Sequence, residues 1–108
     1  MNKPTLRVCY RNFWPEFDPE RMPQDHFFEF ALSRQFDVLR VDDRPDVVIY
    51  SVFGAPPRRD EFAGKPLLVA YSGEPVDAGG TPDLRFGFDP RPQPDYVRLP
   101  LWALYLIW

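Results

Sequence analysis

Glu74 is the side chain in this sequence whose position best suits ligand chemistry. It comes just after the apolar run 67–71, from which Ser72 and Gly73 separate it, and Pro75 prevents any continuation of that run. Open α/β sheets place ligands outside the carboxyl ends of their strands, so a carboxylate on a turn there is a candidate functional group. A solvated turn acid is the ordinary alternative.

The other strand ends expected in the chain carry aromatic and small residues. These segments are 12–14, 51–54, 72–74, 87–89 and 99–102. In a mostly parallel sheet several of them meet at one edge. Aromatic rings there suit the C–H face of a pyranose, and carboxylates suit its hydroxyl groups, so the pattern indicates a sugar. Trp14 and Trp102 also fit a packing role, and Asp89 fits a turn before Pro90.

The hydrophobic pattern predicts an α/β fold, a Rossmann-like and mostly parallel sheet with flanking helices. Strands are expected at 5–12, 36–41, 46–53, 67–71, 84–88 and 96–99, a helix at 25–36 and one helical turn at 58–63. The run 46–53 is almost continuously apolar, which is typical of a strand buried on both faces. At 108 residues the chain is one small domain.

Composition narrows the classes of function. The net charge is −3 and the basic residues are evenly spread, which argues against nucleic acid. The single cysteine, Cys9, excludes an internal disulfide framework and a cysteine metal cluster, and it fits a small buried hydrophobe. No dinucleotide fingerprint or phosphate-binding loop is present, so we expect no cofactor and no metal. No segment approaches a membrane span and no signal peptide begins the chain, so a cytoplasmic protein is expected.

The last residues, 99–108, are almost entirely apolar. Domain termini are usually polar, so this segment should pack against something. We expect a sheet truncated at its carboxyl end, with marginal stability and self-association through residues 102–108.

Several segments together resemble the bacterial α-1,3-fucosyltransferases of glycosyltransferase family ten. They read DVVIYSVFG at 46–54, VAYSGE at 69–74, RFGFD at 85–89 and YVRLPL at 96–101, with NFW at 12–14 and FALSRQ at 30–35. The resemblance covers nearly all of residues 5–105.

The resemblance implies one half of a two-domain enzyme of the GT-B type. Its amino-terminal Rossmann-like domain, here 1–108, would bind the glycan acceptor, and a missing donor domain, in cis or in trans, would bind GDP-fucose. Glu74 would be the general base of an inverting transfer. The implied acceptor-binding residues are Asn12, Trp14, Phe53, Gly54, Ser72, Gly73 and Trp102. Without the donor domain we expect no activity, and the complete enzyme could lie at the inner face of a bacterial membrane.

Two further classes of function stay open. The first is a carbohydrate-binding domain that has lost catalysis. The second is a fragment that serves only in interaction, as the apolar end of the chain indicates. Acceptor binding separates the enzyme half and the binding domain from the fragment, and a donor half separates the enzyme half from the binding domain. A nucleotide ligand is a weaker alternative, because no glycine-rich strand-to-helix turn is present.

Overall fold

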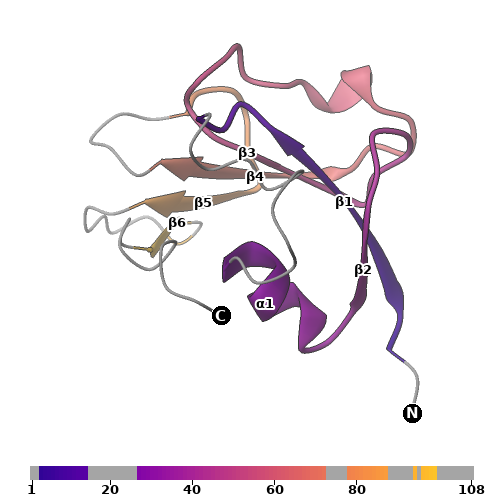
Figure 1. Ribbon diagram of the computed structural model, residues 1–108. Helices are drawn as coiled ribbons and strands as arrows, with labels where there is room; N and C mark the ends of the chain where they lie inside the picture. The colour runs from indigo at the N-terminus through magenta and orange to yellow at the C-terminus, as the bar shows by residue number, and fades with distance from the viewer. Residues whose placement is uncertain (1–2, 15–26, 73–77, 88–93, 95, 100–108) are drawn as a thin grey trace.

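The described part of the chain forms a six-stranded, entirely parallel sheet (Figure 1). The computed structural model describes residues 3–14, 27–72, 78–87, 94 and 96–99. The strands are β1 (Thr5–Arg11), β2 (Asp37–Arg40), β3 (Val47–Tyr50), β4 (Leu67–Ser72), β5 (Leu84–Gly87) and β6 (Tyr96–Arg98). The helix α1 (Phe27–Ser33) connects β1 to β2, and the short 3₁₀-helix η1 (Arg59–Glu61) lies between β3 and β4.

The strand order is β2-β1-β3-β4-β5-β6. The chain therefore moves to one side of β1 to form β2 and to the other side to form the remaining strands. Val8 pairs with Arg40 of β2 and also with Val47 of β3, so β1 is shared by both halves of the sheet. The carboxyl ends of β1 and β3 flank the point where the strand order reverses, which is where doubly wound sheets bind ligands.

Both faces of the sheet are covered by apolar side chains. On the α1 face the buried cluster contains Val8, Tyr10, Phe28, Val47, Ile49, Tyr71 and Leu99. On the opposite face it contains Cys9, Val48, Tyr50, Leu68, Ala70 and Ala78, with Phe62 beside η1 packed against it. Figure 1 shows α1 and η1 on opposite sides of the sheet. All four residues of β3 are buried, which confirms that this strand is enclosed on both faces.

The predicted fold class is correct, and every predicted strand is present; β4 extends one residue beyond its predicted end, to Ser72, and the other five strands are shorter than predicted. The helix ends at Ser33, before the predicted boundary, because the amides of Gln35 and Phe36 both bond to the Leu32 carbonyl oxygen and turn the chain into β2. The first two residues of the predicted helix and the apolar segment 100–108 lie outside the described residues. In the part of the chain that the structure describes, neither helix has the length and hydrophobicity to cross a membrane.

Candidate functional site

The ends of β1 and β3 are joined through Asn12. Its backbone has a φ of 64°, a left-handed conformation that asparagine tolerates better than most residues. The Phe53 amide donates to the Asn12 carbonyl oxygen at 3.1 Å, and Asn12 Nδ2 donates to the Ala55 carbonyl oxygen at 2.8 Å. The Asn12 amide group therefore holds the turn that follows β3.

Gly54 lies directly against that amide group. A Cβ atom added at Gly54 would lie 2.8 Å from Asn12 Cγ and closer still to Oδ1, so only glycine fits without movement. The structure thus brings together two predicted site residues, Asn12 and Gly54. Their contact explains why this turn can approach the end of β1 so closely.

Trp14 and Phe53 form an aromatic surface at the same place. Their ring centroids are 5.8 Å apart with an interplanar angle of 52°. Trp14 is half-buried, whereas 53% of Phe53 is exposed. These two predicted site residues follow β1 and β3, at the reversal of the strand order.

A chain of contacting rings, from partly buried Phe13 to buried Phe28 and Tyr71, supports this surface. Phe13 contacts Trp14 at a centroid distance of 6.0 Å and Phe28 of α1 at 5.8 Å. Phe28 in turn contacts Tyr71, near the end of β4, at 5.9 Å. These two contacts of Phe28 are edge-to-face and the Phe13–Trp14 contact is tilted. Such aromatic contacts have preferred geometries, so these rings constrain the residues that they touch.

Ser72 ends β4, the neighbour of β3, and is 7% exposed. The Ser51 hydroxyl, just past the end of β3, is fully buried and has no hydrogen-bond partner among the described residues. Glu74, Gly73 and Trp102 lie outside the described residues. The roles of these three residues, and that of Ser72, stay predictions.

Sequence reasoning missed an ion pair between buried Glu29 of α1 and Arg40 of β2, whose side chain is 22% exposed. Arg40 Nη2 donates to Glu29 Oε2 at 3.0 Å, and Arg40 Nε donates to Oε1. The Tyr10 hydroxyl also donates to Oε1, at 3.5 Å. Burial, and then the Glu29 carboxylate, raise the pKa of Tyr10 well above its ordinary value, so this hydroxyl stays protonated. One feature of the sequence could have indicated this ion pair: Glu29 is an acidic residue next to Phe28, on the apolar side of the predicted helix.

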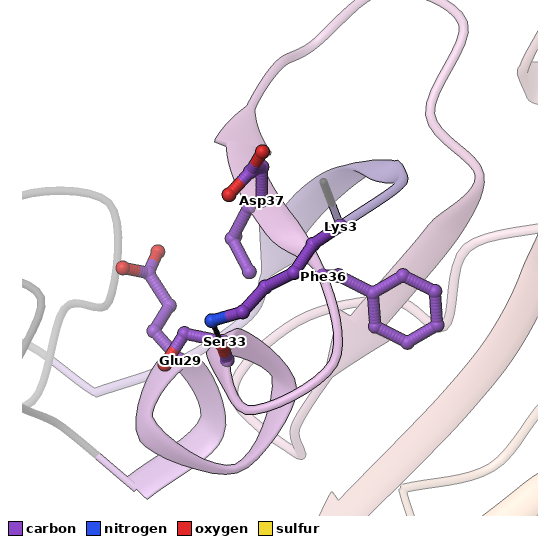
Figure 2. Close-up of a pocket in the computed structure, with 6 residues that line it drawn as sticks. Lys3, Glu29, Ser33, Phe36 and Asp37 are labelled. Atoms are coloured by element: carbon purple, nitrogen blue, oxygen red, sulfur yellow. Dashed lines mark hydrogen bonds between the residues drawn. The ribbon is translucent and has the colours of Figure 1, made fainter. Parts of the chain in front are cut away.

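A separate cavity of about 230 Å³ lies at the amino end of β1 and β2, away from the Trp14–Phe53 surface (Figure 2). It is lined by Lys3, Glu29, Ser33, Phe36, Asp37 and Val38. The Lys3 ammonium group donates to the Ser33 carbonyl oxygen at 2.6 Å, as Figure 2 shows. Lys3 therefore caps the carboxyl end of α1, where its positive charge interacts favourably with the helix dipole.

The described residues contain no cluster of three or more histidine, cysteine, aspartate or glutamate side chains that could hold a metal ion. Among the described residues, this edge of the sheet presents the aromatic rings of Trp14 and Phe53 and the side-chain amide of Asn12.

Comparison with known proteins identifies one matching family and several solved structures that resemble this chain. The family model for the alpha-(1,3)-fucosyltransferase FucT N-terminal domain matches residues 8–105. A crystal structure of an alpha1,3-fucosyltransferase with GDP-fucose has a TM-score of 0.66 and 21% sequence identity, and the match covers 96% of this chain and 29% of that one. A structure with GDP gives a TM-score of 0.62 and 20% identity over 94% of this chain and 28% of that one. The chain thus spans less than a third of the length of these enzymes, and a search of curated sequences found no match.

Proposed function

Because the chain belongs to the family of alpha-(1,3)-fucosyltransferase FucT N-terminal domains, we propose that it is the acceptor-binding half of a fucosyltransferase. The acceptor glycan binds at the carboxyl ends of β1 and β3. A donor half, in the same chain or in a separate one, binds GDP-fucose. The domain alone does not transfer fucose, because a single half cannot hold both substrates in reacting geometry.

The aromatic surface of Trp14 and Phe53 carries this proposal. A sugar ring has an apolar C–H face and a rim of hydroxyl groups, and it packs its C–H face on aromatic rings. The two rings lie where the strand order reverses, and they contact each other while half of Phe53 stays exposed. Covering this patch with a sugar would remove apolar area from water, which supplies binding free energy without a charged group.

The proposed reaction is a single displacement with inversion. The acceptor hydroxyl oxygen forms a bond to the anomeric carbon of fucose while the bond from that carbon to the GDP oxygen breaks. Glu74 takes the hydroxyl proton, and GDP leaves with the bonding electron pair. Glu74 follows β4 by two residues, and β4 lies beside β3, so the strand order is compatible with a base near the aromatic surface.

Substitution of the two rings in the full-length protein tests the acceptor site. Trp14→Ala and Phe53→Ala should each raise the acceptor KM about tenfold, the order expected for losing one stacked ring, and leave the KM for GDP-fucose unchanged. Leu67→Ala is the matched control, because Leu67 is 59% exposed at the opposite end of the sheet. An unchanged acceptor KM in both aromatic variants would show that the acceptor binds elsewhere.

Glu74→Gln tests the chemical step separately. It keeps the size of the side chain and removes the base, so kcat should fall by a factor of about 10² to 10⁴ while the acceptor still binds. Nearly wild-type kcat would exclude Glu74 as the base. Acceptor binding by a wild-type full-length protein that transfers no fucose would instead favour a carbohydrate-binding domain.

A further inference from the structure

We propose that the buried pair of Glu29 and Arg40 is a positioning device for the proposed acceptor site and not mainly a source of stability. The inference rests on the proposed function, since its effect is read in acceptor binding. The ion pair holds α1 against the sheet. Through α1 it fixes the Trp14–Phe53 surface relative to the end of β4.

The pair fixes α1 in a defined rotation. Glu29 is 1% exposed, and Arg40 binds both of its carboxylate oxygens through two different guanidinium nitrogens. A two-point contact between planar groups defines orientation as well as distance. The Tyr10 hydroxyl adds a third contact from β1, so Glu29 ties the helix to two adjacent strands.

Phe28 precedes Glu29 on the helix, so the orientation of α1 that the ion pair defines also sets the position of the Phe28 ring. Its ring lies 5.8 Å from Phe13 and 5.9 Å from Tyr71. Phe13 precedes and contacts Trp14, one ring of the proposed acceptor surface. Tyr71 lies three residues before Glu74, the proposed base. A rotation or slide of α1 would therefore move the support of the acceptor surface relative to the strand that leads to the base.

The stability of the fold does not require an ion pair between Glu29 and Arg40. Replacing a buried ion pair with apolar residues of similar volume is often neutral or stabilising, because the charges no longer need to be desolvated. The helix has only seven residues, too few to be stable without the sheet, so its geometry depends on its contacts. The two-point ion pair adds a defined orientation to the apolar packing that Phe28 gives the helix.

The test compares two variants of the full-length protein. Glu29→Met/Arg40→Met removes the charges and keeps the volume, so we expect a Tm within a few degrees of wild type and an acceptor KM raised about fivefold to tenfold. Arg40→Lys keeps the charge and loses the two-point geometry, so it should raise the acceptor KM in the same direction. Wild-type KM and kcat for the acceptor in Arg40→Lys would overturn the proposal even if the double variant failed to fold.

A double-mutant cycle with Trp14→Ala shows whether the pair acts through the acceptor surface. If it does, Arg40→Lys should change the acceptor KM much less in the Trp14→Ala background than in wild type. Additive effects would overturn the positioning role. An acceptor KM unchanged in both Trp14→Ala and Phe53→Ala would contradict the proposed acceptor site, whereas a raised KM in Trp14→Ala with none in Arg40→Lys would contradict only the positioning.

Discussion

Asp83 and Leu68 exchange two hydrogen bonds at the amino ends of β4 and β5. The Asp83 amide donates to the Leu68 carbonyl oxygen at 2.7 Å, and the Leu68 amide donates to Asp83 Oδ2 at 2.8 Å. Asp46 and Arg7 exchange the same two bonds, each at 2.8 Å, at the start of β3. In both places a carboxylate extends the parallel ladder beyond the first residue of a strand, and so it helps to fix the register on which the opposite edge depends.

Removing the Asp83 charge should lower stability in a pH-dependent way. The Leu68 amide, and secondarily Arg59, lower the pKa of Asp83, whereas partial burial opposes them. A lowered folded-state pKa contributes stability that is present above the unfolded-state pKa and is lost as the pH falls through the folded-state value. Asp83→Asn should therefore lower the free energy of unfolding by about 1 kcal/mol at pH 7, discounted for exposure, with the difference from wild type shrinking below about pH 4.

Urea unfolding of both proteins between pH 3 and pH 7 would measure this difference. Asp60→Asn is the control, because Asp60 pairs with Arg58 on an exposed part of the surface and should change stability little at any pH. A constant difference between wild type and Asp83→Asn down to pH 3 would contradict the assignment of the effect to the carboxylate charge.

The sequence pattern predicted the strands well because a strand buried on one face alternates apolar and polar residues, and a strand buried on both faces is almost continuously apolar. The run 46–53 and the alternation in 5–12 identified β3 and β1, and the glycine and proline positions marked their ends. The aromatic candidates Trp14 and Phe53 followed from these ends. Their contact with each other could be expected only from a parallel sheet in which the two ends adjoin.

The other features of the site and the sheet depend on contacts between different elements, which the local residue pattern does not show. Whether Glu29 faces water or Arg40 depends on the rotation of α1 about its axis, and a helix of seven residues shows that rotation only weakly. Asn12 and Gly54 are separated by 42 positions, so their close approach depends on the register of β1 with β3. Asp46 and Asp83 look like ordinary turn residues in the sequence, because their partners lie on other strands.

Gly54→Ala should destabilise the turn after β3 by displacing the Asn12 side chain. The added methyl group would lie 2.8 Å from Asn12 Cγ, and moving that side chain breaks its bond to the Ala55 carbonyl oxygen. We expect a loss of about 1–3 kcal/mol in the free energy of unfolding, since overpacking and a lost hydrogen bond combine.

Asn12→Gly provides the matched background for this substitution. Glycine accepts the left-handed backbone of residue 12 and has no side chain to collide with an alanine at position 54. Gly54→Ala should therefore cost markedly less in the Asn12→Gly protein than in wild type. Equal costs in the two backgrounds would mean that the contact between the two side chains does not limit this position.

The thiol of Cys9 should react only when the sheet opens. Cys9 is 1% exposed in the centre of β1 and pairs in register with Val48 of β3, so no local motion of a loop uncovers it. As the single cysteine, it reports on one site without ambiguity. The rate of its reaction with a thiol reagent should follow the global free energy of unfolding across a urea series. A fast reaction that is independent of urea would contradict a rigid central β1.

Gly87→Ala should loosen β6 without unfolding the rest of the sheet. Tyr96, the first residue of β6, packs its ring over Gly87, and an added Cβ would lie 2.9 Å from Tyr96 Cζ and 3.0 Å from Cε2. Because β6 is the edge strand and pairs only with β5 among the described strands, displacing the Tyr96 ring should weaken that pairing before it affects the rest of the sheet. The Leu99 amide, which donates to the Gly87 carbonyl oxygen at 2.5 Å, should then exchange with deuterium at least tenfold faster. Amides of β3 should keep their wild-type rates, and the added substitution Tyr96→Ala should cancel most of the effect of Gly87→Ala. Faster exchange throughout β3 and β6 together would show instead that the edge strand unfolds only with the whole sheet.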